Sequence, residues 1–237
     1  MKVIVKYFPM LIALWLCTSC NDSKQTLETD VTVVVDKTDK MTVYPTADEI
    51  TSPLGLKNNP WQGLRFTATY ISDKDINDVT VLTLDAENQW DGNILIRKAK
   101  VRHFVKQVQE CLAGMKYTGT CPYSIIYRTI ARQANGLTGS TAKRKLLLIY
   151  SDLCENDADL NFYDRKVMNR VKNNPQSIAV QLEATVPLNP LNGVQVWLLY
   201  SPGSFKQNND YMPVANLYKQ MLKAKGATVH IGNTLNL

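Results

Sequence analysis

The chain has 237 residues, of which 45% are hydrophobic and 20% are charged, as expected of a folded globular protein. This length supports one domain of ordinary size, or two small ones, with enough apolar residues for a sizeable core. The formal charge of +6 includes no dense basic block beyond Lys143, Arg144 and Lys145. The composition therefore argues against a nucleic-acid-binding protein.

The first twenty residues have the pattern of a leader segment. Lys2 and Lys6 form a short basic region, and residues 7–16 are an apolar run that is too short for a comfortable membrane span. Small residues then precede Cys20. If residues 1–19 are removed, two lysines are lost and the formal charge falls from +6 to +4, with 25 basic residues against 21 acidic ones.

This pattern resembles the lipobox of bacterial lipoproteins, in which signal peptidase II cuts before the cysteine. The departure is Cys17, which stands where the family usually has Leu, Val or Ile. The resemblance implies a signal peptide over residues 1–19, a lipidated Cys20, and a polar tether over residues 20–30. It also implies a protein of the bacterial cell envelope, anchored to a membrane by lipid. An ordinary secretory signal and an uncleaved anchor are the alternatives.

The first part of the domain is predicted to be rich in strands. Residues 31–35 form a β-rich run, and residues 45–63 have the prolines and glycines of a loop with a short helix at 47–51. Residues 64–71 and 79–84 alternate in polarity and are joined by a turn-rich linker. This pattern predicts an antiparallel hairpin.

The remainder predicts helices and strands in alternation. Residues 94–113 have apolar side chains at helical spacing and are followed by Gly114, a natural stop. Further helices are expected at 123–133, 162–172 and 214–225, and strands at 146–150, 194–200 and 227–231. The alternation predicts an α/β fold with a doubly wound, mostly parallel sheet in a three-layer sandwich, the hairpin adding one antiparallel edge strand.

Two of the expected strands end in aspartate. Asp36 follows the run at 31–35, with Thr38 two positions later, and Asp152 follows the apolar run at 146–150. Ligands of open α/β sheets bind outside the carboxyl ends of the strands. Asp36 and Asp152 on one edge would form an oxygen-rich site suited to a hard cation.

The element order and these residues resemble the von Willebrand factor A domain, also called the integrin I-like fold, over residues 31–237. That family has a metal-ion-dependent adhesion site whose first motif is Asp-x-Ser-x-Ser. Asp36 and Thr38 match its first two positions, and Lys40 occupies the third. The family's last aspartate corresponds to Asp152, with Leu153 in place of the usual glycine.

The family's remaining ligand is usually a threonine from the loop between the second and third helices. Thr120 is the first choice here, with Thr118 and Ser124 as alternatives. The resemblance thus implies a Mg²⁺ or Mn²⁺ ion held by Asp36, Thr38, Thr120 and Asp152.

A partner protein would complete the coordination with an acidic residue, so the implied function is protein–protein recognition without catalysis. Lys40 places an ammonium group near the site, where it would repel a dication. A metal-free structural lipoprotein is therefore an alternative reading of the same residues.

An enzyme is the second alternative. Residues 36–40, DKTDK, resemble the opening of the DKTGT phosphorylation motif of P-type ATPases, in which the aspartate is the nucleophile. A phosphohydrolase of the haloacid dehalogenase class would then use Asp36. The final glycine and threonine are missing, and His103 and His230, the only histidines, lie in no triad or zinc spacing.

Three cysteines would remain in the mature chain, in an oxidising compartment. They are Cys111, Cys121 and Cys154. An odd number cannot pair completely within one chain. A Cys121–Cys154 bridge, a Cys111–Cys121 bridge and three unpaired, buried thiols are the alternatives.

Overall fold

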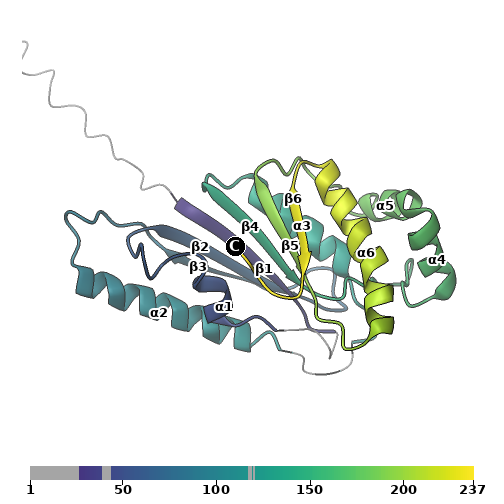
Figure 1. The fold of residues 1–237 in the computed structure, drawn as a ribbon, viewed down its shortest axis with the longest axis horizontal. Coiled ribbons are helices and arrows are strands. Elements are labelled where there is room, and N and C mark those ends of the chain that lie inside the picture. The colour runs from purple at the N-terminus through teal and green to yellow at the C-terminus, as the bar shows by residue number, and fades with distance from the viewer. Residues whose placement is uncertain (1–26, 39–43, 117–118, 120) are drawn as a thin grey trace, which may run out of the picture.

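A single six-stranded sheet lies between two groups of helices (Figure 1). The computed structural model describes residues 27–38, 44–116, 119 and 121–237. The strand order is β3-β2-β1-β4-β5-β6. The strands are β1 (Leu27–Asp36), β2 (Gly63–Ile71), β3 (Val79–Leu84), β4 (Arg144–Tyr150), β5 (Val194–Leu199) and β6 (Thr228–Gly232).

All neighbouring strands pair in parallel except β2 and β3, which form an antiparallel hairpin at one edge of the sheet. The sequence prediction of a mostly parallel, doubly wound sheet with one antiparallel edge strand is confirmed. The chain runs outward from β1 to β2 and β3, and later outward from β4 to β5 and β6. The reversal places a topological switch point between β1 and β4, where ligand sites of open α/β sheets occur.

Helices cover both faces of the sheet, which makes the fold a three-layer sandwich (Figure 1). The helices α1 (Ala47–Thr51) and α2 (Ile94–Ala113) cover one face. The other face is covered by α3 (Ile126–Thr138), α4 (Arg165–Asn173), α5 (Pro175–Glu183) and α6 (Phe205–Ala224). Among the described residues, no helix combines the length and hydropathy needed to cross a bilayer.

The central strands are apolar on both faces because both faces are covered. Val31, Val33 and Val35 pack toward α1 and α2, whereas Val34 packs into the second core under α3 and α6. All four side chains are fully buried. Continuous runs of valine and leucine are typical of strands buried on both sides of a parallel sheet.

The amino-terminal boundary of the sheet differs from the sequence prediction. Strand β1 begins at Leu27, so residues 27–30, expected to belong to the tether, are part of the sheet. Asp30 pairs with Arg65 of β2 on one side and Lys145 of β4 on the other. Polar side chains at these positions obscured the strand, although strand pairing depends on main-chain groups.

Three helices also differ in their bounds from the predictions. Helix α3 begins at Ile126 and continues through Asn135 and Gly136 to Thr138, because Ala134 and Leu137 remain buried in the core. Helix α4 begins only at Arg165, and α6 begins at Phe205, nine residues before the predicted start at 214. Helix α5 was not predicted as a separate element.

Candidate functional site

The carboxyl ends of β1 and β4 lie side by side at the switch point. Val35 of β1 pairs with Tyr150 of β4, so Asp36 and Ser151 leave the sheet next to each other. Ser151 donates a hydrogen bond from Oγ to Asp36 Oδ2 over 2.6 Å. Asp152 is the next residue of the β4 segment, so the two aspartates follow neighbouring strand ends, as the sequence predicted.

The carboxylate of Asp36 organises the loop that follows β1. Its side chain is fully buried, and Oδ1 accepts hydrogen bonds from the amide of Thr38 over 2.8 Å and from Thr38 Oγ1 over 2.6 Å. Short polar side chains commonly bond the backbone two residues ahead in this way. Asp36 therefore fixes the Thr38 hydroxyl beyond the carboxyl end of β1, while Asp36 itself remains buried.

A third chain segment brings Ser124 to the same place. Its hydroxyl is hydrogen-bonded to that of Thr38, and its main chain exchanges two hydrogen bonds with Asn156, of 2.7 and 3.0 Å. Ser124 was one of the alternatives for the ligand from this loop. Thr120, the first choice, and Thr118 lie outside the described residues, as do Lys40 and Cys20.

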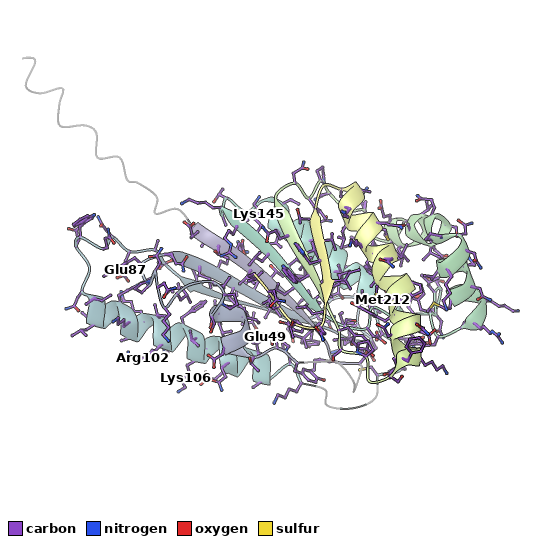
Figure 2. All side chains as sticks on the ribbon, in the orientation of Figure 1. Glu49, Glu87, Arg102, Lys106, Lys145 and Met212 are labelled. Atoms are coloured by element: carbon purple, nitrogen blue, oxygen red, sulfur yellow. The ribbon has the colours of Figure 1, made fainter. Side chains whose placement is uncertain are left out.

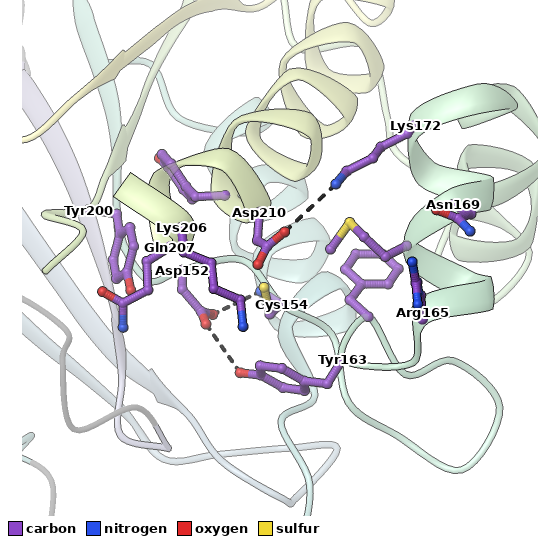
Figure 3. Close-up of a pocket in the computed structure, with 13 residues that line it drawn as sticks. Asp152, Cys154, Tyr163, Arg165, Asn169, Lys172, Tyr200, Lys206, Gln207 and Asp210 are labelled. Atoms are coloured by element: carbon purple, nitrogen blue, oxygen red, sulfur yellow. Dashed lines mark hydrogen bonds and ion pairs between the residues drawn. The ribbon is translucent and has the colours of Figure 1, made fainter. Parts of the chain in front are cut away.

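Asp152 points toward Tyr163, in the loop before α4 (Figure 3). Its Oδ1 accepts a hydrogen bond from the amide of Cys154 over 2.8 Å, and Oδ2 accepts one from the Tyr163 hydroxyl over 3.1 Å. The side chain is partly exposed, unlike that of Asp36. The sequence predicted the position of Asp152 but gave no sign that Tyr163 contacts it.

The residue after Asp152 has an unusual backbone conformation. Leu153 has a φ of 62°, and no other non-glycine residue in the described part of the chain has a positive φ. Left-handed backbone is unfavourable for a branched side chain and persists where the surrounding structure imposes it. The buried Leu153 side chain and the hydrogen bond from its amide to Ser151 Oγ, over 2.9 Å, hold this turn in place.

A cavity of about 780 Å³ opens beside Asp152 (Figure 3). Its walls come from the loops after β4 and β5 and from α4 and α6. It has both charged and aromatic walls, and within it Lys172 and Asp210 form an ion pair of 3.7 Å. The lining residues are Asp152, Cys154, Phe162, Tyr163, Arg165, Met168, Asn169, Lys172, Tyr200, Lys206, Gln207, Asp210 and Tyr211.

The segment that carries Ser124 is held by a buried carboxylate that sequence reasoning missed. Ile125, the residue before α3, makes no side-chain cap, and Glu155 caps the helix instead. Its carboxylate accepts hydrogen bonds from the amides of Ile126 and Tyr127, the shortest over 2.6 Å. Burial raises the pKa of Glu155 to about 8, although the two amide donors and nearby Arg128 favour the charged form.

The basic residue next to Asp36 is directed elsewhere. The ammonium group of Lys37 lies 4.4 Å from the centre of the Tyr70 ring, in a cation–π contact. The amide of Lys37 donates to the carbonyl of Ile71 over 3.2 Å and so continues the sheet. This arrangement keeps the Lys37 charge on the β2 side of the site.

The cysteines and histidines of the described residues form neither a disulfide nor a metal-ligand cluster. Neither of the two candidate disulfides, Cys121–Cys154 and Cys111–Cys121, is present among the described residues. His230 stacks on Trp197 with ring centres 4.4 Å apart, which is a packing role.

Among the residues that the structure describes, no three His, Cys, Asp or Glu side chains cluster as metal ligands do. A site built from two carboxylates and several hydroxyls, as predicted here, would not form such a cluster. Comparison with known proteins finds no matching family model and no matching curated protein.

Proposed function

We propose that this protein is a lipid-anchored protein of the bacterial envelope whose domain, similar to a von Willebrand factor A domain, recognises a partner protein through a divalent cation. The observation that carries the proposal is the meeting of three polar segments at the switch point. Asp36 and Thr38 follow β1, Ser151 and Asp152 follow β4, and Ser124 precedes α3.

The chemistry of these groups suits a hard cation such as Mg²⁺ or Mn²⁺. Thr38 and Ser151 each donate a proton to Asp36, so the lone pairs of both hydroxyl oxygens are directed away from that carboxylate. Mg²⁺ prefers oxygen ligands and keeps several waters, so it needs only a few protein groups. Thr38 and Ser124, with Thr120 as the predicted further ligand, would hold the ion, and Asp36 would supply a buried negative charge. Asp152 would join them by releasing its hydrogen bond from the Tyr163 hydroxyl.

Such an ion would leave coordination positions for a carboxylate from a partner protein. The cavity beside Asp152 gives neighbouring residues of that partner a place to bind. The turn at Leu153 adds support, because its left-handed backbone is the conformation that glycine favours at this point of the family motif.

The phosphohydrolase alternative is less well supported. A nucleophilic aspartate needs an accessible oxygen, whereas Asp36 is fully buried and both its oxygens accept hydrogen bonds. No observation on the described residues favours that reaction over cation binding. A metal-free structural protein differs from the proposal only in its response to divalent cations, which is directly measurable.

The decisive measurement is thermal unfolding of the protein with Mg²⁺, with Mn²⁺ and with a chelator. A cation at a hundred times its Kd should stabilise the fold by about 2.7 kcal/mol, which corresponds to roughly 5–10 °C for a domain of this size. Asp152→Ala should abolish the increase. Equal melting temperatures in all three conditions for the wild type would refute the cation site and favour the metal-free alternative.

The matched control is Asp159→Ala, which removes an exposed carboxylate from the same loop region and should leave the cation response unchanged. Asp36→Ala is unsuitable as the main variant, since it removes the acceptor of three hydrogen bonds in a buried position. The anchor is tested separately by incorporation of radiolabelled palmitate, which Cys20→Ser should prevent.

A further inference from the structure

The loop between β3 and α2, together with the first turn of α2, exposes three large apolar side chains. Trp90 is 84% exposed, Leu95 74% and Ile96 56%. We refer to these three residues as the Trp90 surface. The three residues lie within seven positions of one another in the sequence. Apolar side chains that are exposed in a group mark contact sites more often than single ones do.

The structure holds this loop in a fixed conformation. Arg97, only 1% exposed, donates hydrogen bonds to the carbonyls of Pro60 and Gln62 and forms an ion pair of 3.1 Å with Glu87. Gly92 lies so close to Trp61 that a Cβ atom at this position would come within 2.3 Å of the indole ring. A buried arginine and a tightly packed glycine thus support a turn whose own apolar side chains are directed outward.

The Trp90 surface lies at the end of the sheet where the chain enters the domain (Figure 1). Leu27 at the start of β1 pairs with Gly63, and Leu64 in turn pairs with Leu84 at the end of β3. The loop that follows Leu84 is therefore at the same end of the strands as the first residue of β1. The candidate cation site lies at the other end of the strands, because β1 runs from the Trp90 end of the sheet to the end with Asp36.

The chain before β1 is short enough to keep the start of β1 near a membrane. Seven residue steps separate Cys20 from Leu27. A fully extended chain spans at most about 3.6 Å per residue, so a lipid on Cys20 holds the start of β1 within about 25 Å of the bilayer. Strand β1 has ten residues and is about 33 Å long, which is more than the tether can span.

Charges on the same edge suit a phospholipid surface. Lys143, Arg144 and Lys145, the densest basic run of the chain, lie at the start of β4 at this end of the strands, where Figure 2 shows Lys145, and Lys143 forms an ion pair of 2.9 Å with Glu28. Lys98 and Lys100 follow the Trp90 surface on α2, where Lys100 forms an ion pair of 2.8 Å with Glu87 and Lys98 is exposed. Asp85 and Asp91 of the loop are also exposed. Tryptophan with leucine and isoleucine, followed by basic residues on the helix, is a composition found in segments that lie in the headgroup region.

We propose that the Trp90 surface rests in the headgroup region of the membrane to which Cys20 is anchored. This inference rests on the lipid anchor in the proposed function and adds an orientation to it. The end of the sheet where β1 begins would contact phospholipid. The opposite end, with Asp36 and Asp152, would face away from the membrane, toward partners.

The test uses the full chain in vesicles of phosphatidylcholine and phosphatidylglycerol, in which bromine atoms on the lipid tails quench tryptophan fluorescence. Brominated lipid should reduce the emission of the wild type, and Trp90→Phe should remove that loss. The double variant Leu95→Ser with Ile96→Ser should also prevent quenching while the protein still floats with the vesicles. Both variants change exposed residues, and an unchanged melting temperature would show that they fold.

Phe205→Ser is the matched control. Phe205 is 81% exposed but begins α6 at the opposite edge of the sheet, so its loss should leave quenching unchanged. Lipid on Cys20 with no quenching of Trp90 would overturn this inference and leave the anchor intact. Failure of Cys20 to incorporate palmitate would instead overturn the anchor, and this inference with it.

Discussion

At the scale of single residues, buried ionisable side chains hold the candidate site and the Trp90 loop in place. Asp36 fixes the loop after β1, Glu155 fixes the start of α3, and Arg97 fixes the loop that carries Trp90. Each makes hydrogen bonds to main-chain groups far away in the sequence or in an adjoining loop. Polar groups buried in this way are costly to disturb, because their partners lose hydrogen bonds that water cannot replace.

Glu155 should make the stability of the fold depend on pH. Its pKa rises from an ordinary value of 4.5 to about 8 on folding, so the folded state binds the proton more tightly than the unfolded state. The resulting stabilisation is complete below pH 4.5 and is lost as the pH rises through 8. Between pH 5 and 8 the free energy of unfolding should therefore fall, by an amount on the order of 3 kcal/mol.

Denaturant unfolding of the wild type and of Glu155→Gln at several pH values measures this effect. The glutamine is neutral throughout and should remove most of the pH dependence, whereas Asp159→Asn, at an exposed position, should retain it. If the free energy of unfolding changed with pH in the same way in the wild type and in Glu155→Gln, Glu155 would not be the source of the pH dependence.

Arg97 should be the most sensitive basic residue of α2. Arg97→Met leaves the carbonyls of Pro60 and Gln62 without their donor, and we expect a loss of about 3–5 kcal/mol in the free energy of unfolding. Arg102→Met, at an exposed position of the same helix, should change it by no more than about 0.5 kcal/mol. Similar denaturation midpoints for the two variants would show that the Arg97 hydrogen bonds contribute little.

At the scale of elements, helices α2 and α3 begin by different means. Asn93 caps α2 from the adjacent position, by accepting from the amides of Leu95 and Ile96. Helix α3 has no such local cap and depends on Glu155 from the loop after β4. The start of α2 was therefore predictable from the local sequence, whereas the predicted start of α3 was three residues too early.

The cap of α2 gives a further prediction at this scale. Asn93→Ala should lower the free energy of unfolding by about 1 kcal/mol, because two amides of the first helical turn lose their acceptor. Asn93→Asp keeps an oxygen acceptor at the same place and should cost much less. A loss of the same size in both variants, measured by denaturant unfolding, would contradict the capping role.

At the scale of the whole molecule, the apolar runs predicted the architecture well. The runs that became β1 and β4 fixed the place of Asp36 and Asp152, because strands buried on both faces read as continuous apolar segments. Ser151, Tyr163 and Glu155 could not be predicted as neighbours of the site, since their contacts span distant or irregular parts of the chain. The backbone conformation of Leu153 was still harder to predict, because nothing in its residue type suggests a positive φ.

The position of β1 has a mechanical consequence. It lies in the interior of the sheet, pairs in parallel with β2 and β4 along nearly its whole length, and continues directly from the amino-terminal segment. With the proposed anchor before β1 and the proposed partner bound beside Asp152 at the end of β4, a pull on the amino terminus would load the hydrogen bonds of β1 in shear. Because many bonds would share that load at once, the sheet would resist such a pull better than it would if its strands separated one bond at a time.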